Sequence, residues 1–130
     1  MWAKDMKLFD AIKFDENGLV PVVIQDWQNN EVLMVAYMNR ESLKTTIETG
    51  KTHFWSRSRQ KYWMKGESSG HTQEIKEIFI DCDADCILMK VEQKVAACHT
   101  GFRGCFYRKW EDGEFKTVGV KVFNEEDVYK

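Results

Sequence analysis

The chain has 130 residues, of which 43% are hydrophobic and 13% aromatic, and its formal net charge is −2. A chain of this size can bury about two-thirds of its unfolded surface, so we expect a single domain over residues 1–130 with a real core. The composition excludes intrinsic disorder, the charge offers no basic field for nucleic acid, and the apolar runs are too short to cross a membrane. The first residues lack a secretory pattern, so we expect a cytoplasmic protein.

The first part of the chain predicts two strands followed by a short helix. Residues 19–26, "LVPVVIQD", are rich in β-branched residues, and residues 31–38, "EVLMVAYM", are apolar on both faces, as a central strand would be. Asn39 has the character of a helix N-cap, residues 40–49 follow it as a short helix, and Gly50 stands at the stop.

The rest of the chain predicts mostly strands. "KTHFWSRS" (51–58) is expected to be a strand that leads into a basic loop, and residues 73–80 and 86–93 are expected to be two strands around an acidic turn. A further turn, "EDGE" (111–114), separates two short runs near the end. Many strands with one clear short helix predict an α+β fold with a mainly antiparallel sheet or a partly closed barrel.

The acidic turn "FIDCDADC" (79–86) places three carboxylates, those of Asp81, Asp83 and Asp85, among thiols. Carboxylates that converge in a turn repel one another unless a hard cation lies among them, and Mg²⁺ is the usual one. A calcium-binding EF-hand is excluded because Cys86 stands where that loop needs glycine. A solvated acidic turn is the simpler alternative, but the interleaved pattern favours a magnesium site.

The four cysteines are Cys82, Cys86, Cys98 and Cys105. Without a secretory pattern, such a cluster indicates metal binding or catalysis more than disulfides. The glycines of "CHTGFRGC" (98–105) allow the loop to fold back, so that both of its sulfurs could face one point. Three thiolates would leave zinc with an open position for catalysis, whereas four would close a structural site. Cys86 opens an apolar strand and fits a small buried residue best.

The segment "FWSRSRQKYWMKG" (54–66) mixes cations with aromatic rings, and "SSGH" (68–71) adds hydroxyl groups. Such a mixture can bind phosphate and stack on a base. Taken alone, however, the segment is explained more simply as a solvated basic strand with aromatic residues in the core. The candidate substrate-binding residues in these segments are Arg57, Arg59, Trp63, Lys65 and Ser69.

Five motifs together resemble the phosphoribosyl-AMP cyclohydrolase family of histidine biosynthesis. They are "AYMNRESL" (36–43), "TGKTHFWSRSRQKYWMKG" (49–66), "SSG" (68–70), "DCDAD" (81–85) and "ACHTGFRGCFYR" (97–108). The resemblance runs from about Val20 to Arg108. It implies a hydrolase that opens the N1–C6 bond of the adenine ring of phosphoribosyl-AMP, requires Zn²⁺ and Mg²⁺, and works as an obligate homodimer.

The resemblance also implies roles for individual residues. Asp81, Asp83 and Asp85 resemble the magnesium ligands of the family. Cys82 resembles a zinc ligand from one subunit, and Cys98 and Cys105 resemble the ligands from the other. His99, beside Cys98, is the first candidate for proton transfer to N1, and Arg57, Arg59 and Lys65 are candidates for holding the two phosphates of the substrate.

The chain departs from the family at two positions, where Cys86 replaces an apolar residue or threonine and Gly104 replaces the usual serine. Some relatives carry a fused pyrophosphohydrolase domain, for which 130 residues leave no room. A zinc nucleobase deaminase is excluded because its H-x-E and P-C-x-x-C signature is absent. The remaining alternative is a structural zinc module that uses all four cysteines to bind a partner and does not need the aspartates.

Overall fold

The computed structural model describes residues 3–128 and forms short helices and strands throughout. In chain order the elements are α1 (Ala3–Ala11), β1 (Leu19–Asp26), β2 (Val32–Asn39), α2 (Arg40–Thr49), β3 (His53–Ser56), β4 (Lys61–Met64), β5 (Gln73–Ile80), β6 (Ile87–Gln93), β7 (Arg108–Glu111), β8 (Glu114–Thr117) and α3 (Glu125–Val128). None of the helices within this range is long and apolar enough to cross a membrane.

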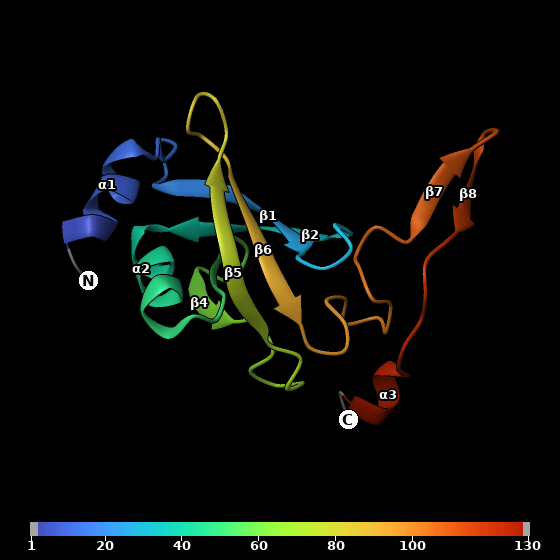
Figure 1. The fold of residues 1–130 in the computed structure, drawn as a ribbon. Helices are drawn as coiled ribbons and strands as arrows, with labels where there is room; N and C mark the ends of the chain where they lie inside the picture. Colours follow the sequence, from blue (N-terminus) through green and yellow to red (C-terminus); the bar gives the residue numbers. More distant parts are fainter. Residues whose placement is uncertain (1–2, 129–130) are drawn as a thin grey trace.

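The main sheet has the strand order β2-β1-β6-β5 (Figure 1). β1 pairs antiparallel with β2 and β5 pairs antiparallel with β6, but β1 and β6 run parallel, so the sheet is mixed. The hairpins β3–β4 and β7–β8 form two separate antiparallel pairs. The predicted α+β class is confirmed. The barrel alternative is wrong, because the strands of residues 3–128 form an open four-stranded sheet and two hairpins.

Helix α2 occupies the predicted range because its ends carry strong local signals. The Asn39 side chain accepts a hydrogen bond from the Ser42 amide at 2.8 Å, and the Ser42 hydroxyl accepts one from the Asn39 amide at 2.9 Å. This reciprocal capping box satisfies two amides that the first turn leaves free. Gly50 ends the helix with a φ of 77°, which glycine adopts without strain. Helices α1 and α3 were not predicted from the sequence.

The core lies on one face of the main sheet. Alternate residues of the two central strands are fully buried there: Val20, Val22 and Ile24 of β1, and Ile87, Met89 and Val91 of β6. Phe9 of α1, Leu43 of α2 and Phe54 of β3 pack into the same cluster. Residues of α1, α2 and β3 therefore complete one core with the two inner strands, and the loops between the elements are left at the surface for the site.

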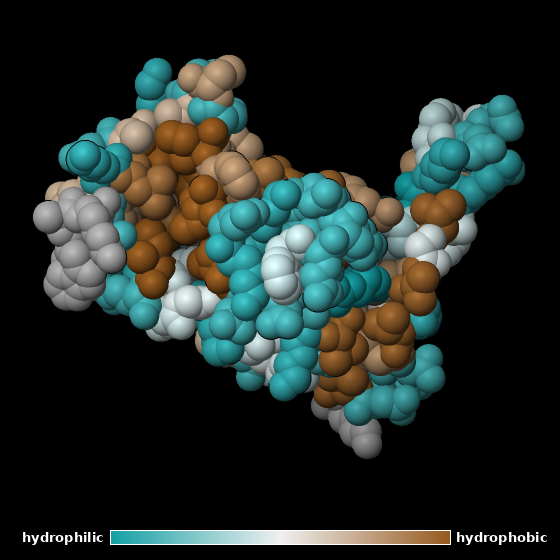
Figure 2. Space-filling view, viewed as in Figure 1, coloured by the Kyte–Doolittle hydropathy of each residue, from teal (hydrophilic) through white to brown (hydrophobic). Residues whose placement is uncertain are grey.

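Two features of the outline matter for the site. The turn between β5 and β6 lies at one end of β6, and the segment that follows β6 lies at its other end (Figure 1). The β7–β8 hairpin projects away from the main sheet. Viewed from the same side, Figure 2 shows hydrophobic surface between α1 and β5, and again between the β7–β8 hairpin and α3. On the hairpin itself, Trp110 and Phe115 are 63% and 64% exposed.

Candidate functional site

The acidic turn brings its three carboxylates together within a few residues. Oxygen atoms of Asp81, Asp83 and Asp85 all lie within 4.8 Å of one another, and the three residues are exposed. The turn closes on itself, because one oxygen of Asp81 accepts the amides of Asp85 at 3.0 Å and Cys86 at 3.2 Å. Ala84 adopts a φ of 62° at its tip, and its carbonyl accepts the Lys13 amide at 2.7 Å. The segment that follows α1 therefore also holds the turn.

The carboxylates of this turn titrate against one another. A hydrogen bond with Asp83 raises the pKa of Asp85, and the same hydrogen bond lowers the pKa of Asp83. Carboxylates this close resist full ionisation together, and a divalent cation removes that conflict. Charged oxygens are also the ligands that Mg²⁺ prefers, so the donor set fits the magnesium ion that the sequence predicts.

The cysteine loop, residues 96–105, gathers two of the predicted zinc ligands. Cys98 is buried, and its sulfur lies 2.9 Å from the Thr100 hydroxyl oxygen. Cys105 is an exposed residue whose thiol is the neighbour of Cys98. Partial desolvation of this thiol raises the pKa of Cys105 to about 12, and the charge and hydrogen bonding of Cys98 add to the shift. Gly101 allows the loop to fold back, because its φ of 102° favours glycine. A Cβ at this position would clash with the Phe123 carbonyl oxygen at 2.2 Å. The glycine prediction for this loop is thus confirmed at Gly101.

Lys65 lies against this pair of sulfurs. Its Nζ donates a hydrogen bond to the Ala97 carbonyl, directly before Cys98. Burial lowers the pKa of Lys65, and the nearby Cys105 and Cys98 oppose that shift. The sequence analysis linked Lys65 only to phosphate, because nothing in the spacing of residues 65 and 98 signals that they meet.

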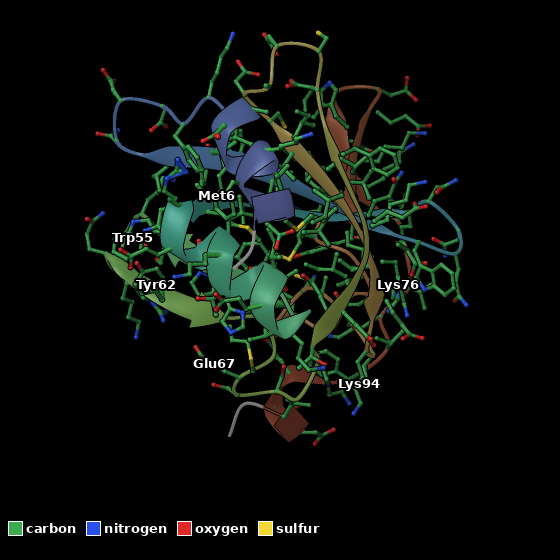
Figure 3. The ribbon with its side chains drawn as sticks, turned by 60° about the vertical axis from the view of Figure 1, so that its left-hand side comes forward. Met6, Trp55, Tyr62, Glu67, Lys76 and Lys94 are labelled. Atoms are coloured by element: carbon green, nitrogen blue, oxygen red, sulfur yellow. The ribbon has the colours of Figure 1, made fainter. Side chains whose placement is uncertain are left out.

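A cleft of about 280 Å³ opens beside the cysteine loop. Five residues predicted for the site line it together, namely Arg59, Trp63, Lys65, Ser69 and His99. Glu67, which also lines it, marks the loop after β4 in Figure 3, where Trp55 and Tyr62 lie side by side on the β3–β4 hairpin. The cleft is bordered by a basic and aromatic hairpin on one side and the cysteine loop on the other.

Arg57 is not part of this group. Its guanidinium lies 4.0 Å from the centre of the Tyr37 ring, and it lines a separate hollow with Trp55 and Gln60. The side chains of Arg57 and Arg59 therefore serve different surfaces, although the sequence analysis gave both the same role. Since a single residue, Ser58, separates them in a turn, their directions could not be read from the sequence.

Cys82 and Cys86 lie at the opposite end of β6 from the cysteine loop. The seven residues of β6 alone span about 23 Å at the usual rise of a strand. Cys82 is exposed, whereas Cys86 is half-buried with its sulfur 3.9 Å from the Ile87 carbonyl oxygen. Within residues 3–128, the acidic triad is the one group of three potential metal ligands, so a single chain forms neither a three-thiol nor a four-thiol site.

Arg103, inside the cysteine loop, was missed by the sequence analysis. Its guanidinium forms an ion pair with buried Asp26 and donates hydrogen bonds to the carbonyls of Gln93 and Val95, each at 3.0 Å. The loop is therefore anchored to the ends of β1 and β6. A lone arginine between two glycine-containing stretches carries no sequence signal for such a role.

Comparison with known proteins identifies the family of the chain. The family model of phosphoribosyl-AMP cyclohydrolase matches residues 34–107. Phosphoribosyl-AMP cyclohydrolase of Methanosarcina mazei is 60% identical over 121 residues, which cover 93% of this chain and 98% of the relative. That of Methanococcoides burtonii is 58% identical over 120 residues, covering 92% and 97%. The histidine biosynthesis bifunctional protein HisIE of Thermoanaerobacter pseudethanolicus is 57% identical over 123 residues, but this chain spans only 57% of its length. The chain belongs to the phosphoribosyl-AMP cyclohydrolase family.

Proposed function

We propose that the chain hydrolyses the N1–C6 bond of the adenine ring of phosphoribosyl-AMP and so opens the ring in histidine biosynthesis. The observation that carries this proposal is the cleft that places His99, Lys65 and Trp63 around one space beside the two neighbouring thiols. A ring-opening hydrolysis needs a flat surface for the base, cations for the phosphates and a group that transfers a proton, and these side chains supply all three.

Each residue of the cleft has a specific task in this proposal. The Trp63 indole stacks on the purine, and Arg59 and Lys65 bind phosphate oxygens. Ser69 donates its hydroxyl to the substrate at the same rim. Water adds to C6, the C6–N1 bond breaks, and N1 receives a proton. His99 is exposed and lines the cleft, so its imidazole is placed to carry that proton to N1.

The chemistry of the two groups of donor atoms supports one zinc ion and one magnesium ion. Zinc prefers sulfur, and Cys98 and Cys105 present neighbouring thiols; when bound there, zinc would activate the attacking water. Magnesium prefers charged oxygen, and Asp81, Asp83 and Asp85 present it. The three carboxylates and the Cys98–Cys105 pair differ in hardness and lie at opposite ends of β6, so the two ions bind at separate places.

A homodimer completes the zinc site in this proposal. The separation of Cys82 from the cysteine loop supports it, because one chain cannot bring the three sulfurs to one ion. With a two-fold axis, Cys82 of each subunit reaches the cysteine loop of the other, and two equivalent sites result. The substrate is a small molecule, with no role for nucleic acid or a membrane, and the enzyme acts in the cytoplasm.

The test is a direct assay of ring opening. Purified protein loaded with zinc and supplied with Mg²⁺ is incubated with phosphoribosyl-AMP, and the ultraviolet absorbance of the purine is followed. We expect a change that requires both ions and that is absent in a Cys98→Ala variant. An unchanged spectrum with folded, zinc-loaded protein would reject the proposed activity.

A further inference from the structure

Three uncharged polar side chains form a buried chain between the strands that support the cleft. Thr52 and Gln73 are fully buried, and Gln93 is 6% exposed. The Thr52 hydroxyl donates to Gln73 Oε1 at 2.8 Å, and Gln73 Nε2 donates to Gln93 Oε1 at 2.7 Å. The hydrogen bonds all point in one direction, towards Gln93. This chain of hydrogen bonds is separate from the titratable groups and thiols of the proposed reaction.

Gln93, at the far end of this hydrogen-bond chain, contacts two loops at once. Gln93 Nε2 lies 3.2 Å from the His71 carbonyl oxygen, 3.1 Å from that of Lys94 and 3.2 Å from that of Ala96, so its two hydrogens can bond to both loops at once. His71 ends the loop that carries Ser69, and Ala96 lies two residues before Cys98. Glu67, in the first of these loops, and Lys94, just before the cysteine loop, lie at the same end of the molecule in Figure 3.

The position requires a carboxamide. Gln93 must accept from Gln73 on one side and donate to carbonyls on the other, and a carboxylate of the same shape has no hydrogen to donate. A hydrocarbon side chain would remove the Gln93 acceptor of the Gln73 amide, which would keep only the Met34 sulfur at 3.4 Å, and would remove the donor to the buried carbonyls, which is costly. Within residues 3–128 no buried side-chain nitrogen or oxygen lacks a partner, so the chain is fully satisfied as it stands.

Both ends of this hydrogen-bond chain are also connected to the cysteine loop. At its start, the Thr52 carbonyl accepts the Lys65 amide at 3.1 Å, and the Lys65 ammonium holds the Ala97 carbonyl. At its finish, the Gln93 carbonyl accepts a hydrogen bond from Arg103 of the cysteine loop at 3.0 Å. The same few residues therefore fix both walls of the cleft.

We propose that Gln93 is a positioning residue that holds the loop of residues 65–72 and the cysteine loop in register, so that Ser69, Lys65 and His99 face one substrate. This inference rests on the proposed function. It adds a role for a side chain that contacts neither the substrate nor a metal ion, and it explains why polar residues occupy core positions of β5 and β6.

The test compares Gln93→Glu and Gln93→Met with Gln25→Met. Gln25 is half-buried on β1, and its side chain donates a hydrogen bond to the Asn30 carbonyl at 2.8 Å, so it serves as the matched control for the same change. Amide hydrogen exchange measures the local opening of both loops independently of enzymatic activity. We expect exchange in residues 65–72 and 94–105 to rise together, by about tenfold or more, in both Gln93 variants and in neither loop of the control.

Kinetics provide the second measurement. In zinc-loaded Gln93→Glu protein we expect zinc stoichiometry to be retained and kcat to fall by about 10- to 100-fold, as for groups that orient metal ligands. If the Gln93 variants do not fold, Thr52→Val removes the first donor of the chain and Thr52→Ser keeps it, so only Thr52→Val should loosen both loops.

Faster exchange in only one loop, or exchange like that of Gln25→Met, would overturn the inference, as would an unchanged kcat. A wild-type protein that is inactive on phosphoribosyl-AMP would instead reject the proposed function. The exchange experiment would then still decide whether Gln93 couples the two loops.

Discussion

The acidic turn and the cysteine loop carry the two predicted metal sites, and they are built in opposite ways. The acidic turn places its carboxylates by hydrogen bonds among residues 81–86, with one further bond from Lys13. The cysteine loop depends on distant strands and segments: the Cys105 amide donates to Leu33 of β2, and the Arg103 amide donates to the Val120 carbonyl. One site is local, and the other depends on the whole fold.

This difference explains why a single chain brings the three predicted magnesium ligands together but does not bring together the three predicted zinc ligands. A five-residue turn can converge three carboxylates because alternate side chains need only a bend to meet. The Cys82 sulfur, in contrast, is separated from the neighbouring sulfurs of Cys98 and Cys105 by the length of β6. Changes in the acidic turn should therefore act on one site of one subunit, whereas changes at the thiols should act across subunits.

The strongest test of this contrast is subunit complementation. Cys82→Ala and Cys98→Ala proteins should each lose zinc and more than about 100-fold in activity, since even groups that only orient zinc ligands are worth 10- to 100-fold. Mixed under conditions of exchange, they should recover about a quarter of the wild-type activity, because half of the dimers are mixed and each has one intact site. Activity and bound zinc are measured before and after mixing.

The matched control for complementation is a mixture of Cys98→Ala with Cys105→Ala. These ligands belong to the same half of the site, so every site in that mixture lacks a sulfur and no activity should return. Cys86→Ala alone should keep its zinc, because Cys86 is half-buried against its own strand. Verified exchange without recovery in the first mixture would show that the zinc site is not shared.

A smaller effect is expected at the cleft beside the cysteine loop. His99→Ala should retain zinc and lower kcat by about 100-fold, the usual contribution of a positioned proton donor. The change leaves the thiols in place, so it separates proton transfer from metal binding. His53→Ala, on β3, is the control and should leave kcat near the wild-type value. A near-normal kcat in His99→Ala would assign the proton transfer to another group or to water.

The acidic turn should respond more mildly and only to magnesium. Asp83→Asn removes one charged oxygen, so we expect the Mg²⁺ concentration for half-maximal activity to rise by about tenfold. Zinc content should stay at the wild-type level, because the change leaves the Cys82, Cys98 and Cys105 thiols in place. Asp15→Asn, in an exposed turn of the same chain, is the control. Normal magnesium activation in Asp83→Asn would remove this residue from the proposed site.

The sequence predicted the local features of the molecule and missed the distant ones. Helix α2 was predicted at its observed bounds because Asn39, Ser42 and Gly50 fix its ends through short-range hydrogen bonds. The acidic turn was found for the same reason. The parallel pairing of β1 with β6 joins segments that are far apart in sequence, and no residue pattern in either strand specifies its neighbour.

The residues of the candidate site also fall into a local group that the sequence predicted and a distant group that it missed. Neighbouring residues such as Cys98 and His99 could be assigned to one loop from the sequence, but the approach of Lys65 to Ala97 and the chain from Thr52 to Gln93 arise from packing between strands. Glutamine at positions 73 and 93 looks like an ordinary surface residue until the fold shows that it is buried. Polar groups that position a site are therefore the part that sequence patterns reveal least.

The smallest expected effect concerns His71, which is buried and packs edge-on against Phe123. Burial lowers the pKa of His71, and the charges of Lys65 and Lys94 add to this shift. The folded protein thus binds a proton at His71 less readily than the unfolded chain does, whose imidazole has a pKa of about 6.5. Stability should therefore fall as the pH drops below about 6.5, because protonation favours the unfolded chain. His71→Gln lacks this proton, so the difference between its Tm at pH 7.5 and at pH 5.5 should be smaller than in wild type. An equal drop in both proteins would show that other groups control the acid sensitivity of this end of the molecule.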